Sequence, residues 1–127
     1  MKIIHIITSL DDGGTEKILY NICKHDLNNQ HFVISLKNSG KYFSKLKQIG
    51  IEVHSMSMAF YSILKFFYLV KKISYIKPDI VQTWLPHADL LGGFAARLAK
   101  VKNIVWNIRY SKLEKGTVSL GIIILIL

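Results

Sequence analysis

The sequence contains a single cysteine, Cys23, among its 127 residues. An intramolecular disulfide is therefore excluded, and a reducing compartment such as the cytoplasm fits best. We expect Cys23 to be a small buried residue rather than a nucleophile. The histidines at positions 5, 25, 31 and 54 are scattered, and no HxxxH, HExxH or CxxC spacing occurs. We therefore expect no metal site and no cofactor.

Acidic residues are also few, with 8 Asp and Glu against 17 Lys and Arg, so the net charge is +9. Such an excess favours anionic partners, namely nucleic acid, phospholipid surfaces or phosphorylated small molecules. Charge alone does not choose among them. Nothing in the sequence resembles an RNA-binding aromatic platform, so we expect no nucleic-acid partner.

Long apolar runs are missing, since no stretch of about eighteen apolar residues exists to cross a bilayer. The apolar segment 1–10 has no cleavage site for a signal peptide and is interpreted as a first buried strand. Half of the residues are hydrophobic, which is typical of one globular domain with a real core.

Strand-like and helix-like segments alternate along the chain. β-Branched and apolar runs predict strands at 2–8, 31–36, 51–54, 79–83 and 103–107. Helical spacing predicts helices from Thr15 to Asn28, and at 42–48, 60–76 and 87–100, and we expect the apolar segment from Thr117 to begin another helix. This order predicts an α/β, Rossmann-like fold: a parallel sheet in the order 3-2-1-4-5 with helices on both faces.

Two of the predicted helices have distinctive faces. The helix at 87–100 is rich in small residues, including Gly92 and Ala96, and we expect it to lie close on the sheet. In the helix at 60–76, helical spacing predicts a buried stripe of Phe60, Ile63, Leu64, Phe67, Val70 and Ile73.

The first candidate site is the loop after the first strand, where Gly13 and Gly14 precede a helix. Paired glycines let the backbone approach a ligand, and the free N–H groups of a helix start attract phosphate or hydroxyl groups. The loop is neither a G-x-G-x-x-G fingerprint nor a P-loop. Asp11 is a candidate catalytic carboxylate, and Asp12 is interpreted as the helix cap. A tight turn without a ligand is the alternative interpretation.

The second candidate site follows the fourth strand. In the predicted strand order, the loops after the first and fourth strands line one crevice, where ligands of doubly wound sheets bind. Trp84 is a candidate to stack on the ring face of a sugar or to wall the cleft, and His87 is a candidate catalytic group that exchanges hydrogen bonds with a hydroxyl. A structural role is the alternative for His87, and we interpret Asp89 as stabilising the helix dipole.

Two further groups of residues are candidates to bind anionic partners. Arg109, after the fifth strand, is a candidate to bind a phosphate or carboxylate in the cleft, and a salt bridge to Asp89 or Glu114 is the alternative. Lys65, Tyr68 and Lys72 lie on one face of the helix at 60–76 and are candidates to contact a membrane surface, with a solvated face as the alternative.

The segment KIIHIITSLDDGGTEKILYNI resembles the opening of family 4 retaining glycosyltransferases, which typically show a Gly-Gly-Ala-Glu signature there. DIVQTWLPHADLLGGFAARLA followed by NIVWNIR resembles a subgroup of the same family. The similarity runs in the same order from Lys2 to about Gly116.

This resemblance implies a GT-B architecture, in which two Rossmann-like domains face each other across a cleft. Residues 1–127 would be the N-terminal, acceptor-side domain, in which Trp84, His87 and Arg109 would face the acceptor. A C-terminal domain would hold most of the nucleotide sugar, a co-substrate. In the family, glycines matching Gly13 and Gly14 approach the donor diphosphate, and catalysis needs no metal ion. Acceptors are often lipid-linked sugars or lipid phosphates at the cytoplasmic membrane face, as in polysaccharide or glycolipid biosynthesis.

The sequence departs from the family in two respects. Many relatives carry a histidine directly after the fourth strand, where this chain has Trp84, and His87 lies three residues further on. No segment matches the C-terminal domain with its paired-glutamate motif, and the sequence ends in GIIILIL, inside what we expect to be a further helix of the first domain. We therefore expect the domain to be incomplete at its C-terminal end and inactive alone. The alternative function is a non-enzymatic basic module that binds a membrane surface or polyanion.

Overall fold

A computed structural model describes the chain except residues 12, 38–39, 57–62, 85, 108–121 and 127. The elements follow the order β1 (Lys2–Ile7), α1 (Gly14–His25), β2 (Gln30–Ser35), α2 (Lys41–Gln48), β3 (Glu52–Ser55), α3 (Ile63–Ile76), β4 (Ile80–Trp84), α4 (Pro86–Leu98), β5 (Asn103–Asn107) and β6 (Ile122–Ile126). The predicted alternation of strands and helices is confirmed through β5.

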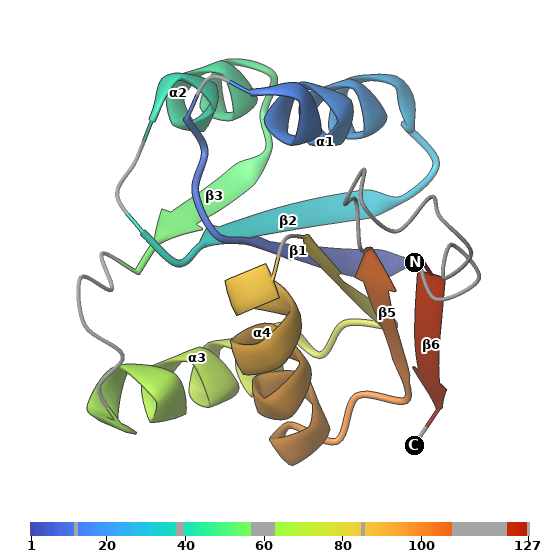
Figure 1. The fold of residues 1–127 in the computed structure, drawn as a ribbon. Coiled ribbons are helices and arrows are strands. Elements are labelled where there is room, and N and C mark those ends of the chain that lie inside the picture. The colour runs from blue at the N-terminus through green and yellow to red at the C-terminus, as the bar shows by residue number, and fades with distance from the viewer. Residues whose placement is uncertain (12, 38–39, 57–62, 85, 108–121, 127) are drawn as a thin grey trace, which may run out of the picture.

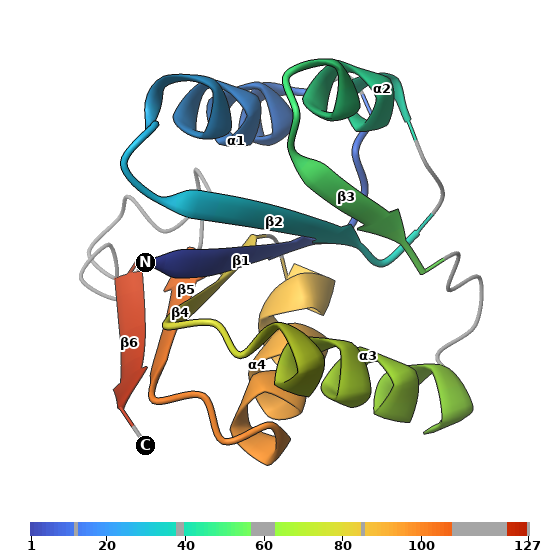
Figure 2. The ribbon, with the colours of Figure 1, turned by 180° about the vertical axis from the view of Figure 1, so that it is seen from behind.

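The strands form one sheet in the order β3-β2-β1-β4-β5-β6, and the first five are parallel. This confirms the Rossmann-like α/β fold and the predicted order 3-2-1-4-5. The chain moves outward from β1 in one direction and then returns to start β4 on its other side. Right-handed crossovers therefore place α1 and α2 on one face of the sheet and α3 and α4 on the other (Figures 1 and 2).

The C-terminal segment differs from the prediction. We expected a helix to begin at Thr117, but Ile122–Ile126 forms β6, which pairs antiparallel with β5. The segment is a run of isoleucines broken by one leucine, and β-branched side chains favour strands over helices. The prediction of an apolar element in this segment was therefore right, and the prediction that this element is a helix was wrong.

Alternating residues of the strands supply two separate cores. On β1, Ile4 and Ile6 pack into the cluster beneath α3 and α4, while Ile7 packs into the cluster beneath α1 and α2. Both faces of the central strand are buried, as expected for a parallel sheet covered on both sides.

The close packing predicted for α4 is confirmed. A Cβ atom at Gly92 would lie 2.9 Å from Cγ2 of Thr83 and 3.1 Å from Ile6, and Ala96 is fully buried in the same cluster. Small side chains on α4 thus let its backbone approach β1 and β4 directly.

The buried stripe predicted for α3 is partly wrong. Ile73 is fully buried and Val70 packs against the core, but Leu64 is 84% exposed and Phe67 is 56% exposed. The core instead receives Phe66, Leu69 and Ile76. Because α3 is apolar around most of its circumference, helical spacing fits more than one stripe, and the sequence pattern alone does not choose between them.

Candidate functional site

The two candidate loops leave the sheet side by side at its carboxyl edge. β1 pairs with β4 in parallel, and Ile7 at the end of β1 lies opposite Trp84 at the end of β4. The strand order reverses between these two strands, which is where doubly wound sheets bind ligands. The carboxyl ends of β1 and β4 are thus neighbours, as the predicted strand order requires.

Two adjacent glycines at the start of α1 have different surroundings. A Cβ atom at Gly13 would lie 2.7 Å from Oε1 of Glu16, whose carboxylate folds back over the helix start. Glu16 is the third residue of α1 and is mostly buried, as in the reciprocal caps that glutamates make at this position. Gly14 is exposed, and nothing lies within 4 Å of its Cβ position. The open backbone at the helix start is therefore that of Gly14.

The cap of α1 is not Asp12 as predicted, because the N-cap residue is Gly13, which makes no side-chain capping bond. Asp12 itself lies outside the described residues. The carboxylate of Glu16 lies at the positive end of this helix, where the aspartate was expected. A negative charge in the first turn of a helix interacts favourably with the helix dipole. Glu16 is a residue whose contact with the loop was missed in the sequence.

Asp11 is exposed at the carboxyl edge, beside the start of α2. Its Oδ1 and the carbonyl oxygen of Leu10 each lie 2.6 Å from the Cβ position of Gly40, and the Tyr42 N–H donates to the Leu10 carbonyl at 3.0 Å. The loop after β1 is therefore held against α2 by backbone contact, with the Asp11 side chain at the surface. A catalytic role for Asp11 stays a prediction.

Trp84 does not project from the carboxyl edge of the sheet in this structure. Its side chain is fully buried beneath α1 and α2, and its indole Nε1–H donates to Nδ1 of His5 at 3.2 Å. Trp84 was expected to project toward a ligand. Its register on β4 instead directs the ring to the face of the sheet that also carries His5 and Ile7. Stacking on an acceptor sugar would require the indole to turn outward.

The structure describes only some of the remaining predicted site residues. His87 lies in the first turn of α4, but its side chain and all of Arg109 fall outside the described part of the structure. On α3, Tyr68 is 57% exposed, while Lys65 and Lys72 are half-buried. The structure thus confirms that Tyr68 is accessible and leaves the ligands of these residues as predictions.

Asp89 ties the start of α4 to the end of β4. It is buried, and its Oδ1 accepts a hydrogen bond from the Thr83 hydroxyl at 2.7 Å. Burial raises the pKa of Asp89 to about 6, although the hydrogen bond from Thr83 acts in the opposite direction. Asp89 is therefore a packed anchor of α4 and not merely an exposed partner of the helix dipole.

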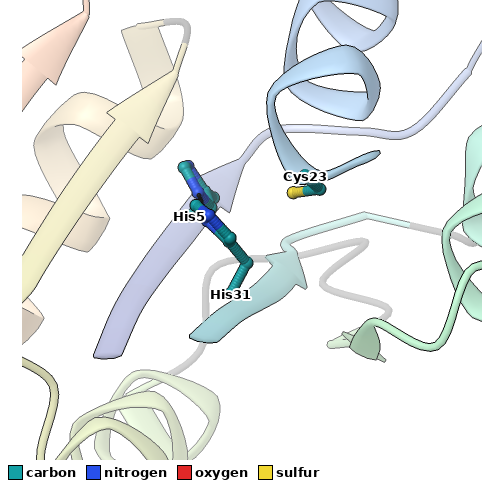
Figure 3. Close-up of side chains that lie close together, drawn as sticks. All are labelled: His5, Cys23 and His31. Atoms are coloured by element: carbon teal, nitrogen blue, oxygen red, sulfur yellow. Dashed lines mark hydrogen bonds between the residues drawn. The ribbon is translucent and has the colours of Figure 1, made fainter. Parts of the chain in front are cut away.

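The structure also brings together histidines that the sequence analysis treated as scattered. His5 on β1 and His31 on β2 stack with ring centroids 5.1 Å apart, and Cys23 of α1 lies over them (Figure 3). One potential ligand atom from each of the three residues lies within 4.8 Å of the other two, and all three residues are buried. The alternation of side chains along the strands could have indicated this pair from the sequence. Once the parallel register is known, both histidines occupy positions that face α1.

The sequence matches no protein-family model and no curated protein. Its fold is similar to that of HepE (Alr3699) of Anabaena in complex with UDP-glucose, with a TM-score of 0.70 and 19% sequence identity over 95% of this chain and 34% of that chain. For HepE in complex with UDP and glucose, the TM-score is 0.70 and the identity 21%, over 85% of this chain and 29% of that chain.

MurG of Acinetobacter baumannii is also similar, with a TM-score of 0.65 and 14% identity over 94% of this chain and 39% of that chain. At these identities the likeness shows a shared fold. The chain spans about a third of the length of HepE.

Within the described residues, no helix combines the length and apolar character needed to cross a membrane.

Proposed function

We propose that this chain forms the N-terminal, acceptor-side half of a GT-B glycosyltransferase that moves a hexosyl group from a nucleotide sugar to an acceptor. The observation that carries the proposal is the match of nearly the whole chain to one third of a protein whose structure holds UDP-glucose. A sugar-nucleotide enzyme built from two facing domains accounts for a single Rossmann-like half of this size.

The carboxyl edge of the sheet supports the same proposal. Gly14 is exposed, and its open backbone at the positive end of α1 suits a diphosphate that approaches from a facing domain. Glu16 already occupies the space at Gly13, so we assign donor-phosphate proximity chiefly to Gly14. Asp11, on the exposed side of the same loop, is the carboxylate best placed to meet an acceptor hydroxyl.

The finer assignments rest on the sequence resemblance. We propose membership of family 4, transfer with retention of anomeric configuration, and a cytoplasmic location. The proposal gives donor binding mainly to a second domain, so the 127-residue chain is expected to lack transferase activity by itself.

A domain exchange tests this proposal. The matching third of HepE is replaced by this chain, and hydrolysis and transfer from UDP-glucose are measured. We expect the chimera to turn over UDP-glucose and the isolated chain to show no turnover. In the chimera, Gly14→Val should lower kcat/KM at least tenfold, because a branched side chain at the helix start blocks the approach of phosphate.

Gly50→Asn is the matched control. The Cβ position of Gly50 is likewise open, its φ of +85° is tolerated by asparagine, and it lies at the end of α2, away from the carboxyl edge. A folded chimera with no turnover, or equal losses from the two substitutions, would count against the proposed function.

A further inference from the structure

Four side chains form a continuous hydrogen-bonded chain across the face of the sheet beneath α1. The Trp84 indole nitrogen lies 3.2 Å from Nδ1 of His5, and Nε2 of His5 lies 2.9 Å from Nδ1 of His31. Nε2 of His31 in turn lies 3.0 Å from Oδ2 of Asp26, the C-cap residue of α1. The first three residues are at most 5% exposed, whereas 31% of the Asp26 side chain is accessible.

The direction of every bond in this chain follows from its first member. An indole nitrogen can only donate, so Nδ1 of His5 must accept and the proton of a neutral His5 must be on Nε2. His5 then donates to Nδ1 of His31, which places the His31 proton on Nε2, facing the Asp26 carboxylate. Both histidines are thus fixed as the Nε2–H tautomer, and all three bonds point from Trp84 toward Asp26.

The hydrogen-bonded chain also runs obliquely over β2, β1 and β4, from the amino ends of the strands to their carboxyl ends. His31 lies opposite Ile3 near the start of β1, and Trp84 lies opposite Ile7 at its end. His5 stands midway, two residues from each, so that each step is diagonal between neighbouring strands. The exposed end at Asp26 is therefore at the amino edge, and the buried end reaches the carboxyl edge, where the candidate crevice lies.

We propose that Asp26, His31 and His5 are positioning residues that hold the indole of Trp84, and with it the carboxyl end of β4, from the opposite edge of the sheet. The hydrogen-bonded chain of side chains does not depend on the proposed function. Its relevance to ligand binding at the candidate crevice rests on the proposed function. A proton added to either histidine leaves two donors facing each other at one link, so the arrangement is stable only with neutral histidines. Burial and the neighbouring His31 lower the pKa of His5 to about 3, opposed by Asp26, in agreement with a neutral ring.

A metal ion held by His5, His31 and Cys23 is the competing interpretation of this cluster. The carboxylate on Nε2 of His31 is compatible with it, because metal-bound histidines commonly donate their other N–H to a carboxylate. His5 is not compatible. A metal on its Nε2 would move the ring proton to Nδ1, where Trp84 already points a hydrogen, and a metal on Nδ1 would displace Trp84. Burial, followed by the influence of Asp26, also raises the pKa of Cys23 to about 12, which favours the thiol over the thiolate that binds metals.

The tautomers test the chain directly. In the 127-residue protein with Trp106→Phe, Trp84 is the sole tryptophan, and ¹⁵N NMR of the imidazole nitrogens reports the proton position. We expect His5 and His31 both to show the Nε2–H pattern at neutral pH and the Trp84 indole N–H to exchange slowly. A mixture of tautomers, or an Nδ1–H form at either ring, would overturn the proposal.

A pair of substitutions at the surface end tests positioning at a distance. Asp26→Asn retains an oxygen acceptor for His31, whereas Asp26→Leu removes it. We expect Asp26→Leu to speed exchange of the Trp84 indole N–H at least fivefold and Asp26→Asn to leave it within twofold, relative to the backbone amides of α3 on the other face. Equal effects of the two substitutions would contradict positioning through the chain.

The same contrast can be made at the centre, where His5→Gln keeps an acceptor and a donor and His5→Leu keeps neither. We expect glutamine to preserve slow indole exchange and leucine to abolish it, and the Asp26 pair decides if His5→Leu does not fold. Titration with Co²⁺ should give no thiolate-to-cobalt absorption band. A band that is present in the parent and absent in Cys23→Ser would establish a metal site and overturn the proposal.

Discussion

At the scale of single residues, the glycines of this chain differ in what surrounds their Cβ positions. Gly40 lies against backbone, with the carbonyl oxygen of Leu10 only 2.6 Å from its Cβ position. Its φ of −129° is available to any residue, so the requirement for glycine is one of space alone. Gly14 is exposed at the first position of α1 and faces nothing within 4 Å.

We therefore predict that Gly40→Ala and Gly14→Ala change stability in opposite directions. Gly40→Ala should lower the free energy of unfolding by about 1–3 kcal/mol, because backbone must shift to admit the methyl group. Gly14→Ala should raise it by up to about 1 kcal/mol, since alanine is the better helix former and restricts the unfolded chain. Urea denaturation of both variants measures the difference, and a tolerated Gly40→Ala would show that the loop after β1 is not held as described.

At the scale of elements, α3 and α4 both carry exposed apolar side chains. Leu64, Phe67 and Tyr68 of α3 are more than half exposed, and so are Leu90, Phe94 and Leu98 of α4. The two helices pack side by side on the same face of the sheet (Figure 1). Lys71 of α3 and Arg97 of α4 are also exposed, and exposed apolar side chains together with cationic ones suit an anionic bilayer.

This surface gives a direct prediction for the membrane contact proposed from Lys65, Tyr68 and Lys72. The protein should float with vesicles that contain anionic phospholipid and not with purely zwitterionic vesicles, because cationic residues near the surface each contribute about 1 kcal/mol only when the lipid is charged. Phe67→Ser should reduce the bound fraction several-fold by removing apolar area from the contact.

Leu27→Ser supplies the matched control for Phe67→Ser. Leu27 is 86% exposed, but it lies in the connection between α1 and β2, away from α3 and α4. Similar losses of vesicle binding from the two substitutions would show that the contact is unspecific and does not involve α3.

At the scale of the whole molecule, two buried groups make the stability depend on pH with opposite signs. Burial raises the pKa of Asp89 to about 6, so the folded state binds a proton more readily than the unfolded chain and stability falls as pH rises from about 4 through 6. Burial and His31 lower the pKa of His5 to about 3, so the unfolded chain binds the proton and stability falls as pH drops from about 6.5 toward 3. Between pH 4 and 6 the two effects oppose each other.

We predict that Asp89→Asn removes one of these effects and exposes the other. Asparagine keeps an oxygen acceptor for the Thr83 hydroxyl but carries no charge. Relative to the parent protein, the variant should gain stability between pH 4 and pH 7, by up to about 3 kcal/mol from a shift of about two pKa units. Urea denaturation at pH 4, 5, 6 and 7 measures the gain, and a difference that does not change with pH would mean that Asp89 titrates normally.

The sequence by itself determined the order of the elements through β5, the parallel sheet and the adjacency of the carboxyl ends of β1 and β4. Runs of β-branched residues, helical spacing and glycine breaks are local signals, and alternating strands and helices permit few right-handed arrangements. The small residues around Gly92 likewise predicted the close approach of α4. The segment 122–126 and the stripe of α3 failed because uniformly apolar stretches carry no clear period.

Only the tertiary structure decided which side chains meet. His5 and His31 are 26 residues apart and Trp84 is 79 residues from His5, so no local spacing marks them as partners. Their contact depends on the register of three parallel strands, which fixes both the face and the height of each side chain. The same register turned Trp84 into the core beneath α1 and α2, because the direction of a strand residue is set by its neighbours in the sheet and not by its place at the end of the strand.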